Sequence, residues 1–469
     1  MSGPAANKYV TLDEDTDSLM SHQPDLLTSR SVEISTQTDA SISSEGSRGG
    51  SMVGGIFILM NAVLGAGVLE FPYMFSKVGL ITAFLLLVFL LICAGTTHIV
   101  LAKTVDLTDS ASYHELIGKI CGFKVLLTAQ VALILYCSGS NIAYMVTVGD
   151  MLQEVCFYVT NTTVETHEYY CDRHFLIPVA SIVVILPVIW FKNISAFGYV
   201  SFFSVASVFY LVAAVFVEYL TTEQRTPVNL WYPPANTDPL TILSVLPSMS
   251  FAYQCHMTSV PLYAELAGRS INKYMVIVGV AMFLATTSYL VVGYTGFAIY
   301  GSSVDPDIIL SFPSGSIIMT VGRVAVTLAI CMTYPIVLFI GRTALEGFVS
   351  EVTRHTSRPL RPNNEKFRIS SIAIWFVVTA AVATFATGIK DVISVVGSIA
   401  ALFMFMYPGC IITVLAWRQS NYAHVFVGAC FVALGVIVFL LNLASTVNDH
   451  MKGHPDGMLS WWTFQVPLS

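Results

Sequence analysis

The chain has 469 residues, of which 55% are hydrophobic and only 11% are charged. Soluble domains carry about 25% charged residues, so this composition excludes a soluble protein and predicts an all-α polytopic membrane protein. The formal net charge is −7, and residues 1–50 account for −5 of it with eight acidic and three basic residues. The rest of the chain is close to neutral, which excludes a nucleic-acid-binding surface.

Residues 1–50 are rich in Ser, Thr, Asp and Gly and poor in aromatic residues. Such a segment buries too little apolar surface to fold, so we predict a disordered cytoplasmic tail. The first apolar run comes only after this tail, which predicts that no cleavable signal peptide opens the chain. Trafficking or regulatory proteins are the partners that such a tail allows.

The first apolar segment, from Met52 to about Phe75, is long enough to span a bilayer, which takes ~20 apolar residues. Its middle is unfavourable for a helix, because Gly65 and Gly67 lie two apart and Pro72 follows them. Broken backbone at membrane depth is tolerated only where it is buried or lines a watery cavity. Transporters use such breaks to hold substrates and ions. The alternative is a Gly/Ala face that packs against a neighbouring helix.

Ten more apolar segments follow, which predicts about eleven transmembrane helices and a transporter domain over residues 51–446. They lie near 79–102, 125–150, 175–191, 197–220, 240–263, 273–300, 317–341, 369–388, 391–416 and 423–446. An odd number puts the termini on opposite sides. With the N-terminus cytoplasmic, the inner loops carry thirteen Lys and Arg residues against five outside. This bias predicts that orientation, with a short non-cytoplasmic tail over 447–469.

The loop after the third segment is then outside the cytoplasm. It contains the glycosylation sequon that begins at Asn161. It also contains Cys156 and Cys171, fifteen residues apart, which an oxidising compartment allows to pair. Because Cys156 lies close to the predicted end of the third segment, the sequence leaves the pairing open.

The sixth segment is the second one that is poorly built for a helix. Pro247 and Pro261 bracket a run of hydroxyl, amide and imidazole groups, including His256. Such groups are expensive in lipid, so we expect them to face the interior of the bundle. His256 either titrates near neutral pH or is a satisfied interior hydrogen-bonding group. Two interrupted helices at matching positions in two halves of a chain indicate a transport site.

Three motifs carry a resemblance to a known family. They are the runs Asn61 to Gly67 and Cys255 to Tyr263, and the triplet Thr333-Tyr334-Pro335. Together they resemble the sodium-coupled neutral amino acid transporters of the amino acid/auxin permease group, over about residues 51–446. The resemblance implies a LeuT-type fold, with a five-plus-five inverted repeat in which spans 1 and 6 are broken. It also implies a substrate between these two spans and a sodium ion between spans 1 and 8.

The sodium site comes from the resemblance, and composition says nothing of the ion. Carried over to this chain, the ligands are the backbone of Met60 and Val63, the side chain of Asn61 and the hydroxyl of Thr333. Thr333 alternatively bonds back to its own helix, and Asn61 alternatively makes an interhelical hydrogen bond. No other cofactor is expected.

An amino acid substrate needs donors for its carboxylate and acceptors for its ammonium group. Unwound backbone at a helix start offers N–H groups to the carboxylate, here at Leu64, Gly65, Ala66 and Gly67. Carbonyls in the broken part of the sixth segment, near Ser248 to Phe251 and including Ser250, are expected acceptors for the ammonium group. Three side chains are candidates to line the pocket, with simple packing as the alternative for each: Phe251, Tyr253 and Asn141.

Glu70 lies beyond the glycines of the first segment. The matching position in LeuT-type transporters carries an outer-gate charge, but a basic one, so this chain departs from the pattern. We expect Glu70 to close the outer vestibule by pairing with Lys390 or Arg323. The alternative is an acid that reaches the outer interface.

No nucleophile elbow, phosphate loop or metal cluster is present in the sequence, so no enzyme is predicted. The predicted function is sodium-coupled symport of small neutral amino acids, of the glutamine, alanine and asparagine class, by alternating access. A proton-coupled transporter and an amino acid-sensing receptor are the alternatives. We expect the protein in the plasma membrane or the lysosomal membrane.

Overall fold

The computed structural model describes residues 50–162, 168–190, 197–223, 231–233, 237, 239–354, 365–386 and 389–453. The predicted N-terminal tail therefore lies outside the described residues except for Gly50. From Gly50 onward the chain forms one compact unit. Throughout the described ranges the secondary structure is helical, with one isolated bridge between Gly50 and Leu266 and no strand.

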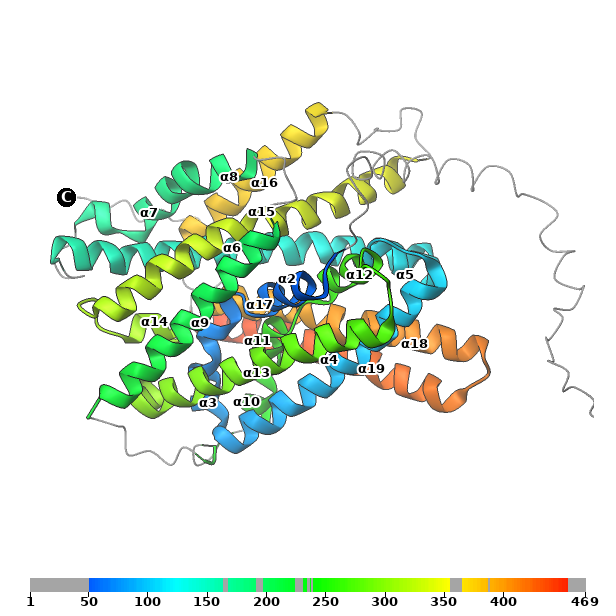
Figure 1. Ribbon diagram of the computed structural model, residues 1–469, viewed down its shortest axis with the longest axis horizontal. Helices are drawn as coiled ribbons and strands as arrows, with labels where there is room; N and C mark the ends of the chain where they lie inside the picture. The colour runs from blue at the N-terminus through cyan, green and yellow to red at the C-terminus, as the bar shows by residue number, and fades with distance from the viewer. Residues whose placement is uncertain are drawn as a thin grey trace, which may run out of the picture. The chain divides into compact units, whose positions relative to one another are not determined.

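The helices follow the apolar segments in order (Figure 1). Their bounds are α2 (Met52–Val63), η2 (Ala66–Glu70), α3 (Phe71–Val78), α4 (Leu80–Thr108), α5 (Tyr113–Cys121), α6 (Phe123–Thr160), η4 (Tyr169–Cys171), α7 (Arg173–Ala180), η5 (Ser181–Ile185), α8 (Leu186–Trp190), α9 (Phe197–Thr221), α10 (Pro239–Ser244), α11 (Leu246–Ala252), α12 (His256–Ala264), α13 (Ile271–Tyr300), η7 (Gly301–Ser303), α14 (Ile308–Ser311), α15 (Ile317–Thr353), α16 (Glu365–Phe385), α17 (Ile389–Ala401), η8 (Leu402–Met406), α18 (Tyr407–Arg418) and α19 (Tyr422–Gly453).

Eight helices of the described chain are long and apolar enough to cross a membrane. The pair Met52–Val63 and Gly67–Val78, bent by 49°, makes a ninth if it is one span. Two predicted segments remain, and both are interrupted: α7 runs through the π-helical turn η5 into α8, and the sixth segment is divided into α10, α11 and α12. The protein is a multi-pass membrane protein, while the number eleven stays a prediction.

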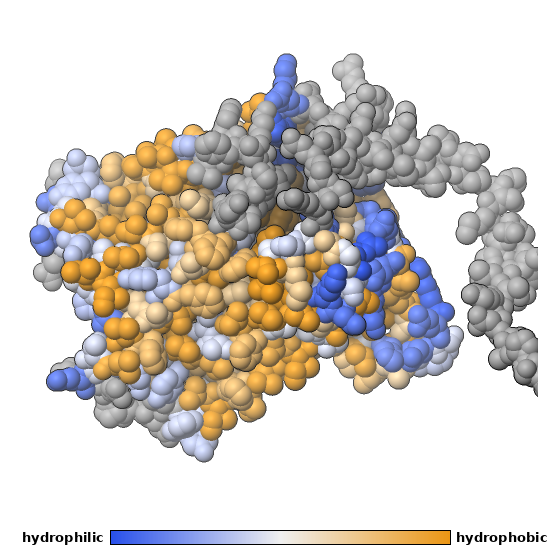
Figure 2. Space-filling model, viewed as in Figure 1, coloured by the Kyte–Doolittle hydropathy of each residue, from blue (hydrophilic) through white to orange (hydrophobic). Residues whose placement is uncertain are grey.

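The surface of these helices suits a lipid environment. Large apolar residues are exposed along α4, such as Phe84, Leu85 and Ile92, and along α16, such as Val377. Figure 2 shows apolar residues over much of the visible face. Because lipid contacts and core contacts are both apolar, these helices expose hydrophobic side chains on the outside as well as burying them inside.

Several helices extend beyond their predicted ends. α6 continues past residue 150 to Thr160, α15 continues past 341 to Thr353, and α19 continues past 446 to Gly453. Hydropathy marks only the part of a helix that lies in lipid, whereas a helix continues into water wherever its polar groups find partners. In α15 the pair Arg342 and Glu346 provides such a contact one turn apart, at 2.5 Å.

The broken first and sixth segments lie among the long helices (Figure 1). α11 packs against α17 and η2, and α17 packs in turn against α6. α2 packs against α13 and α9, and α6 packs along α15. The breaks are therefore enclosed by α6, α9, α13, α15 and α17.

Candidate functional site

The first break interrupts the helix where the sequence predicts it. α2 ends at Val63, and the N–H of Leu64 bonds the carbonyl of Met60 at 2.7 Å as its cap. A 3-10 turn, η2, follows Gly65, and α3 begins with Pro72 in its first turn. Proline is tolerated there because the first N–H groups of a helix have no partner within the helix.

The second break separates α11 from α12. α11 ends at Ala252, and α12 begins at His256, so the expectation that the break lies near Ser248 to Phe251 is wrong and these residues are helical. Between them, the N–H of Gln254 bonds the carbonyl of Phe251 at 3.1 Å. The residues of both half-helices next to the break are largely buried, so the irregular backbone is shielded by protein, as a membrane requires.

The two breaks touch each other. A Cβ atom added to Gly67 would lie 2.9 Å from both the Cα and the Cβ of Ala252. This separation is shorter than real Cβ contacts, so only glycine allows η2 to approach the end of α11 this closely. The glycine pair that interrupts the first helix thus also brings it into contact with the second break.

The Tyr289 hydroxyl of α13 lies at the junction of the two breaks. It donates a hydrogen bond to the carbonyl of Val63 at 2.7 Å and lies 2.8 Å from the carbonyl of Ala252. Sequence analysis did not identify this residue. Its only signal in the sequence is a phenol within an apolar helix, which usually indicates a buried group with a hydrogen-bond partner.

A small cavity adjoins the first break and brings Asn61 and Thr333 together. Its volume is about 20 Å³, which is room for about one water molecule or ion. The Thr333 hydroxyl donates to the carbonyl of Ala329 at 2.9 Å, and its oxygen lone pairs remain available to a ligand. Gly65 and Tyr144 also line the cavity.

The two backbone ligands predicted for sodium already have hydrogen bonds. The carbonyl of Met60 accepts from the N–H of Leu64, and the carbonyl of Val63 accepts from Tyr289. A carbonyl oxygen has two lone pairs, so a second interaction is chemically open to each. Asn61 and Thr333, in contrast, are among the residues that line the cavity, whereas Met60 and Val63 are not.

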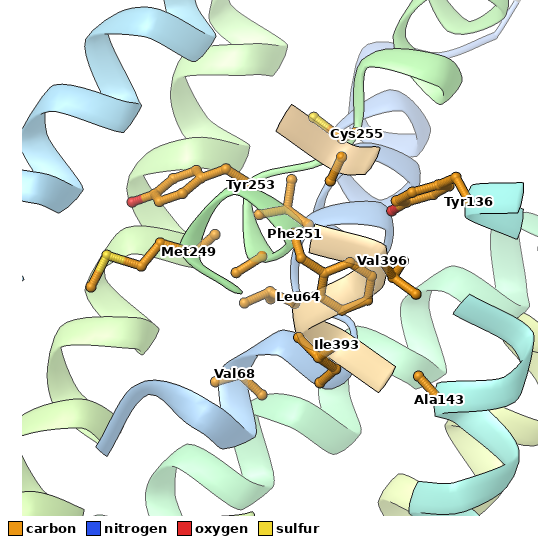
Figure 3. Packing of buried hydrophobic residues seen from close by; sticks show 14 of the residues in the cluster. Leu64, Val68, Tyr136, Ala143, Met249, Phe251, Tyr253, Cys255, Ile393 and Val396 are labelled. Carbon is orange, nitrogen blue, oxygen red and sulfur yellow. The ribbon is translucent and has the colours of Figure 1, made fainter. Parts of the chain in front are cut away.

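The candidate substrate residues divide into two groups. Figure 3 shows the Phe251 ring beside Leu64, Ile393 and Val396, where apolar side chains fill the space between the breaks and α17. Tyr253 points the opposite way (Figure 3), and its hydroxyl bonds Thr286 of α13 at 2.7 Å. Phe251 and Tyr253 therefore do not line one pocket in this arrangement.

Two candidate polar groups are buried without a protein partner. Asn141 of α6 is fully buried, and neither of its amide atoms has a hydrogen bond among the described residues. The hydroxyl of Ser250 in α11 is also buried and has no hydrogen-bond partner among the described residues. Buried polar atoms of this kind are costly unless a water or a ligand satisfies them.

His256 is held inside the bundle by a hydrogen-bond network. Its Nε2 lies 2.8 Å from the Thr97 hydroxyl, and its Nδ1 lies 3.2 Å from the side-chain oxygen of Gln254. The His98 ring lies beside it, with 4.3 Å between ring centroids. Of the two interpretations of this histidine, the structure favours the interior hydrogen-bonding group.

Charged groups gather near the predicted outer end of α6. Arg323 is fully buried, donates to the carbonyls of Ile309 and Phe312, and lies 3.5 Å from Glu154. Glu70 is 2% exposed, which disagrees with an acid at the outer interface. The side chain of its other expected partner, Lys390, lies outside the described residues.

The predicted outer loop begins at the end of α6. Cys156 and Cys171 form a disulfide with 5.6 Å between their Cα atoms, which decides the pairing that the sequence left open. Asn161 caps α6 in the left-handed conformation, with φ of 51°, and is exposed. Thr163, the last residue of its sequon, lies outside the described residues.

Comparison with known proteins identifies the family. A family model described as transmembrane amino acid transporter protein matches residues 48–448. The sodium-coupled neutral amino acid transporter 7 of Xenopus laevis is 33% identical over 402 residues, which cover 83% of this chain and 88% of that protein. The protein of the same name from Homo sapiens is 30% identical, over 85% of this chain and 88% of that protein.

A further relative has a different name. Solute carrier family 38 member 8 of Homo sapiens is 28% identical over 77% of this chain and 85% of that protein. All of these names describe transporters, in agreement with the prediction that the chain is not an enzyme. Because the family model matches most of the sequence, the chain belongs to the transmembrane amino acid transporter protein family, as its motifs predict.

Proposed function

We propose that the protein is a sodium-coupled symporter of small neutral amino acids, of the glutamine, alanine and asparagine class, which works by alternating access. The observation that carries this proposal is the contact between the two helix breaks, beside a cavity lined by Asn61 and Thr333. The names of the relatives with 30–33% identity support sodium and neutral amino acids as the transported species. Eleven spans in two inverted repeats of five, followed by one more helix, are part of the proposal.

The proposed sodium ion lies in the cavity between α2 and α15. Its ligands are the side-chain oxygen of Asn61, the hydroxyl of Thr333 and the carbonyls of Met60 and Val63. A cavity of about 20 Å³ suits one desolvated ion. One charge that crosses a potential of 100 mV supplies about 2.3 kcal/mol, which supports roughly fifty-fold accumulation. The site therefore needs only modest affinity, which lets the ion leave on the inside.

The proposed substrate lies between the two breaks. The backbone N–H groups of Gly65, Ala66 and Gly67 receive its carboxylate, because the start of a helix carries a positive partial charge. The N–H of Leu64, expected with them, is already bonded to the carbonyl of Met60. Acceptors in α11 receive its ammonium group, and the unpartnered atoms of Asn141 and Ser250 are further groups that a polar ligand would satisfy. Apolar side chains around Phe251 fill this space, so the site opens only when α11 and α17 separate.

Closure on the outer side is assigned to Glu70, which is buried close to the first break. Glu154 and two carbonyls contact only Nη2 of Arg323, and its Nε and Nη1 have no hydrogen-bond partner among the described residues. Both Lys390 and Arg323 therefore stay as proposed partners. The N-terminus is proposed to be cytoplasmic, with the tail of residues 1–50 available to regulatory proteins. The plasma membrane and the lysosomal membrane are both compatible with the proposal.

Uptake of labelled amino acid into proteoliposomes tests this function. A sodium gradient should drive accumulation, and Asn61→Ala and Thr333→Ala should each raise the half-saturating sodium concentration roughly tenfold, for a loss of about 1.4 kcal/mol. The double variant should show less than the sum of the two effects, because both groups bind one ion.

Thr327→Ala is the matched control for Thr333→Ala. Thr327 lies on the same helix, is equally buried, and bonds the carbonyl one turn earlier at 2.7 Å, but it does not line the cavity. Its removal should leave sodium dependence unchanged. Uptake that follows a pH gradient and ignores sodium would establish the proton-coupled alternative, and binding without uptake would establish the receptor.

A further inference from the structure

Tyr289 contacts the carbonyl of Val63, a proposed sodium ligand, and also a second helix end that the sodium site does not include. Its hydroxyl is within hydrogen-bond distance of Val63, the last residue of α2, and of Ala252, the last residue of α11. A helix leaves its last carbonyls without partners inside the helix. One phenol is thus the hydrogen-bond donor for the carbonyl ends of both interrupted helices.

The position of this hydroxyl is fixed by aromatic neighbours. The Tyr289 ring stacks on Phe71 of α3, with 4.2 Å between centroids and 13° between planes. Tyr253 packs against it edge-on at 5.5 Å, and the side chain is fully buried. The phenol therefore has no freedom to reach water, and its proton must go to one of the two carbonyls.

The two acceptors compete for this one proton. A hydroxyl donates one hydrogen bond, while both carbonyl oxygens lie within 2.8 Å of it. The C-terminal end of a helix also carries a negative partial charge, so two such ends meet at the junction. A group with more hydrogen-bond donors and a positive charge, such as the ammonium group of an amino acid, would satisfy both carbonyls better than the phenol does.

The arrangement around this junction is closed. Gly67 lies against Ala252, Phe251 packs on Leu64, Ile393 and Val396 (Figure 3), and the cavity lined by Leu64 and Gly65 measures only about 20 Å³. An amino acid does not fit into this volume. In this arrangement the carbonyl ends rely on the protein itself for a donor.

We propose that Tyr289 is a positioning residue whose hydroxyl takes the place of the substrate's ammonium group at the two helix ends when no amino acid is bound. It thereby allows the unloaded carrier to close and to return across its cycle. This inference rests on the proposed function, because only a carrier has a return step. When substrate is bound, its ammonium group supplies the donors and the phenol is no longer required.

Two transport modes separate this role from a structural one. Net uptake requires the unloaded carrier to return, whereas exchange of labelled for unlabelled amino acid does not. Both modes are measured in proteoliposomes, and the exchange assay uses saturating amino acid and equal sodium on both sides. Tyr289→Phe should lower net uptake roughly tenfold (about 1.4 kcal/mol). Exchange should stay within about threefold of the unsubstituted protein.

Tyr113→Phe is the matched control. Tyr113 is equally buried, and its hydroxyl donates to the carbonyl of Phe403 at 2.9 Å, so the substitution removes the same type of bond away from the breaks. It should leave the ratio of exchange to net uptake unchanged. If Tyr289→Phe lowers both modes equally, or neither, the proposal is wrong. If the unsubstituted protein performs neither mode, the proposed function fails instead.

A second variant covers the case in which Tyr289→Phe does not accumulate in the membrane. Tyr289→His keeps an aromatic ring with an N–H donor and should keep the exchange-to-uptake ratio within about threefold of the unsubstituted protein. A ratio raised tenfold in this variant would overturn the proposal, because a donor would then be present without supporting the return step.

Discussion

Gly67→Ala tests directly whether contact between the two breaks matters for transport. The added methyl carbon would lie 2.9 Å from the Cα and Cβ of Ala252. Because one of these atoms belongs to the backbone, rotation of a side chain cannot relieve the contact, and η2 or α11 must move.

The expected loss of transport rate in Gly67→Ala follows from the energetic cost of this steric overlap. Overpacking of one methyl group in a well-packed core costs about 1–3 kcal/mol. If this cost is paid only in the closed arrangement, the closing equilibrium shifts by a factor of about 5 to 150. Transport through the closed arrangement should slow by a comparable factor, while the protein still folds in the other arrangements.

The assay is initial-rate uptake into proteoliposomes, normalised to the amount of folded protein from size-exclusion chromatography. Gly95→Ala in α4 is the matched control, because a Cβ there has no neighbour within 4 Å, and it should transport normally. Ala252→Gly combined with Gly67→Ala removes one of the two contacts and should restore part of the rate. Wild-type uptake by Gly67→Ala alone would refute the reasoning.

Three further predictions concern the predicted outer side. Burial, together with the nearby Asp150, raises the pKa of Asp307 to about 8, whereas the unfolded value is about 3.9. The stability contributed by this proton is present below about pH 4 and is lost as pH rises through 8, so Asp307→Asn should reduce the fall in melting temperature between pH 5 and 8, and an unchanged fall contradicts this. Cys156→Ser should expose Cys171 to thiol reagents and lower delivery to the membrane, since a loop closed by a disulfide gains about 3 kcal/mol; an unreactive Cys171 would be evidence against it. Asn161→Gln should remove a glycosidase-sensitive mass, and an unaltered mass would mean that the sequon is not used.

The helices themselves were predictable from local properties. Each of the eleven apolar segments coincides with helical structure, because a chain in lipid must satisfy its backbone within helices. The break at Gly65 and the interruption of the sixth segment were predictable, since glycine, proline and polar side chains disfavour a continuous apolar helix. The exact place of the second break was not, because it lies after Ala252 and not near Ser248 to Phe251.

The direction of side chains was not predictable. In water, alternation of polar and apolar residues tells which face of a helix is buried. In a membrane both faces are apolar, so the sequence does not distinguish Phe251, which faces α17, from Tyr253, which faces α13. The pairing of Cys156 with Cys171 was not predictable either, because it depends on where α6 ends relative to the loop that carries Cys171.

Local chemistry therefore decides where this chain spans the membrane and where two of its helices break, because hydropathy and backbone strain act between neighbours in sequence. Only packing between distant helices brings Asn61 to Thr333 and Gly67 to Ala252. The same packing places the Tyr289 hydroxyl on two helix ends that are far apart in the chain. These contacts depend on the rotation and spacing of whole helices, which are set by how side chains interlock across the bundle.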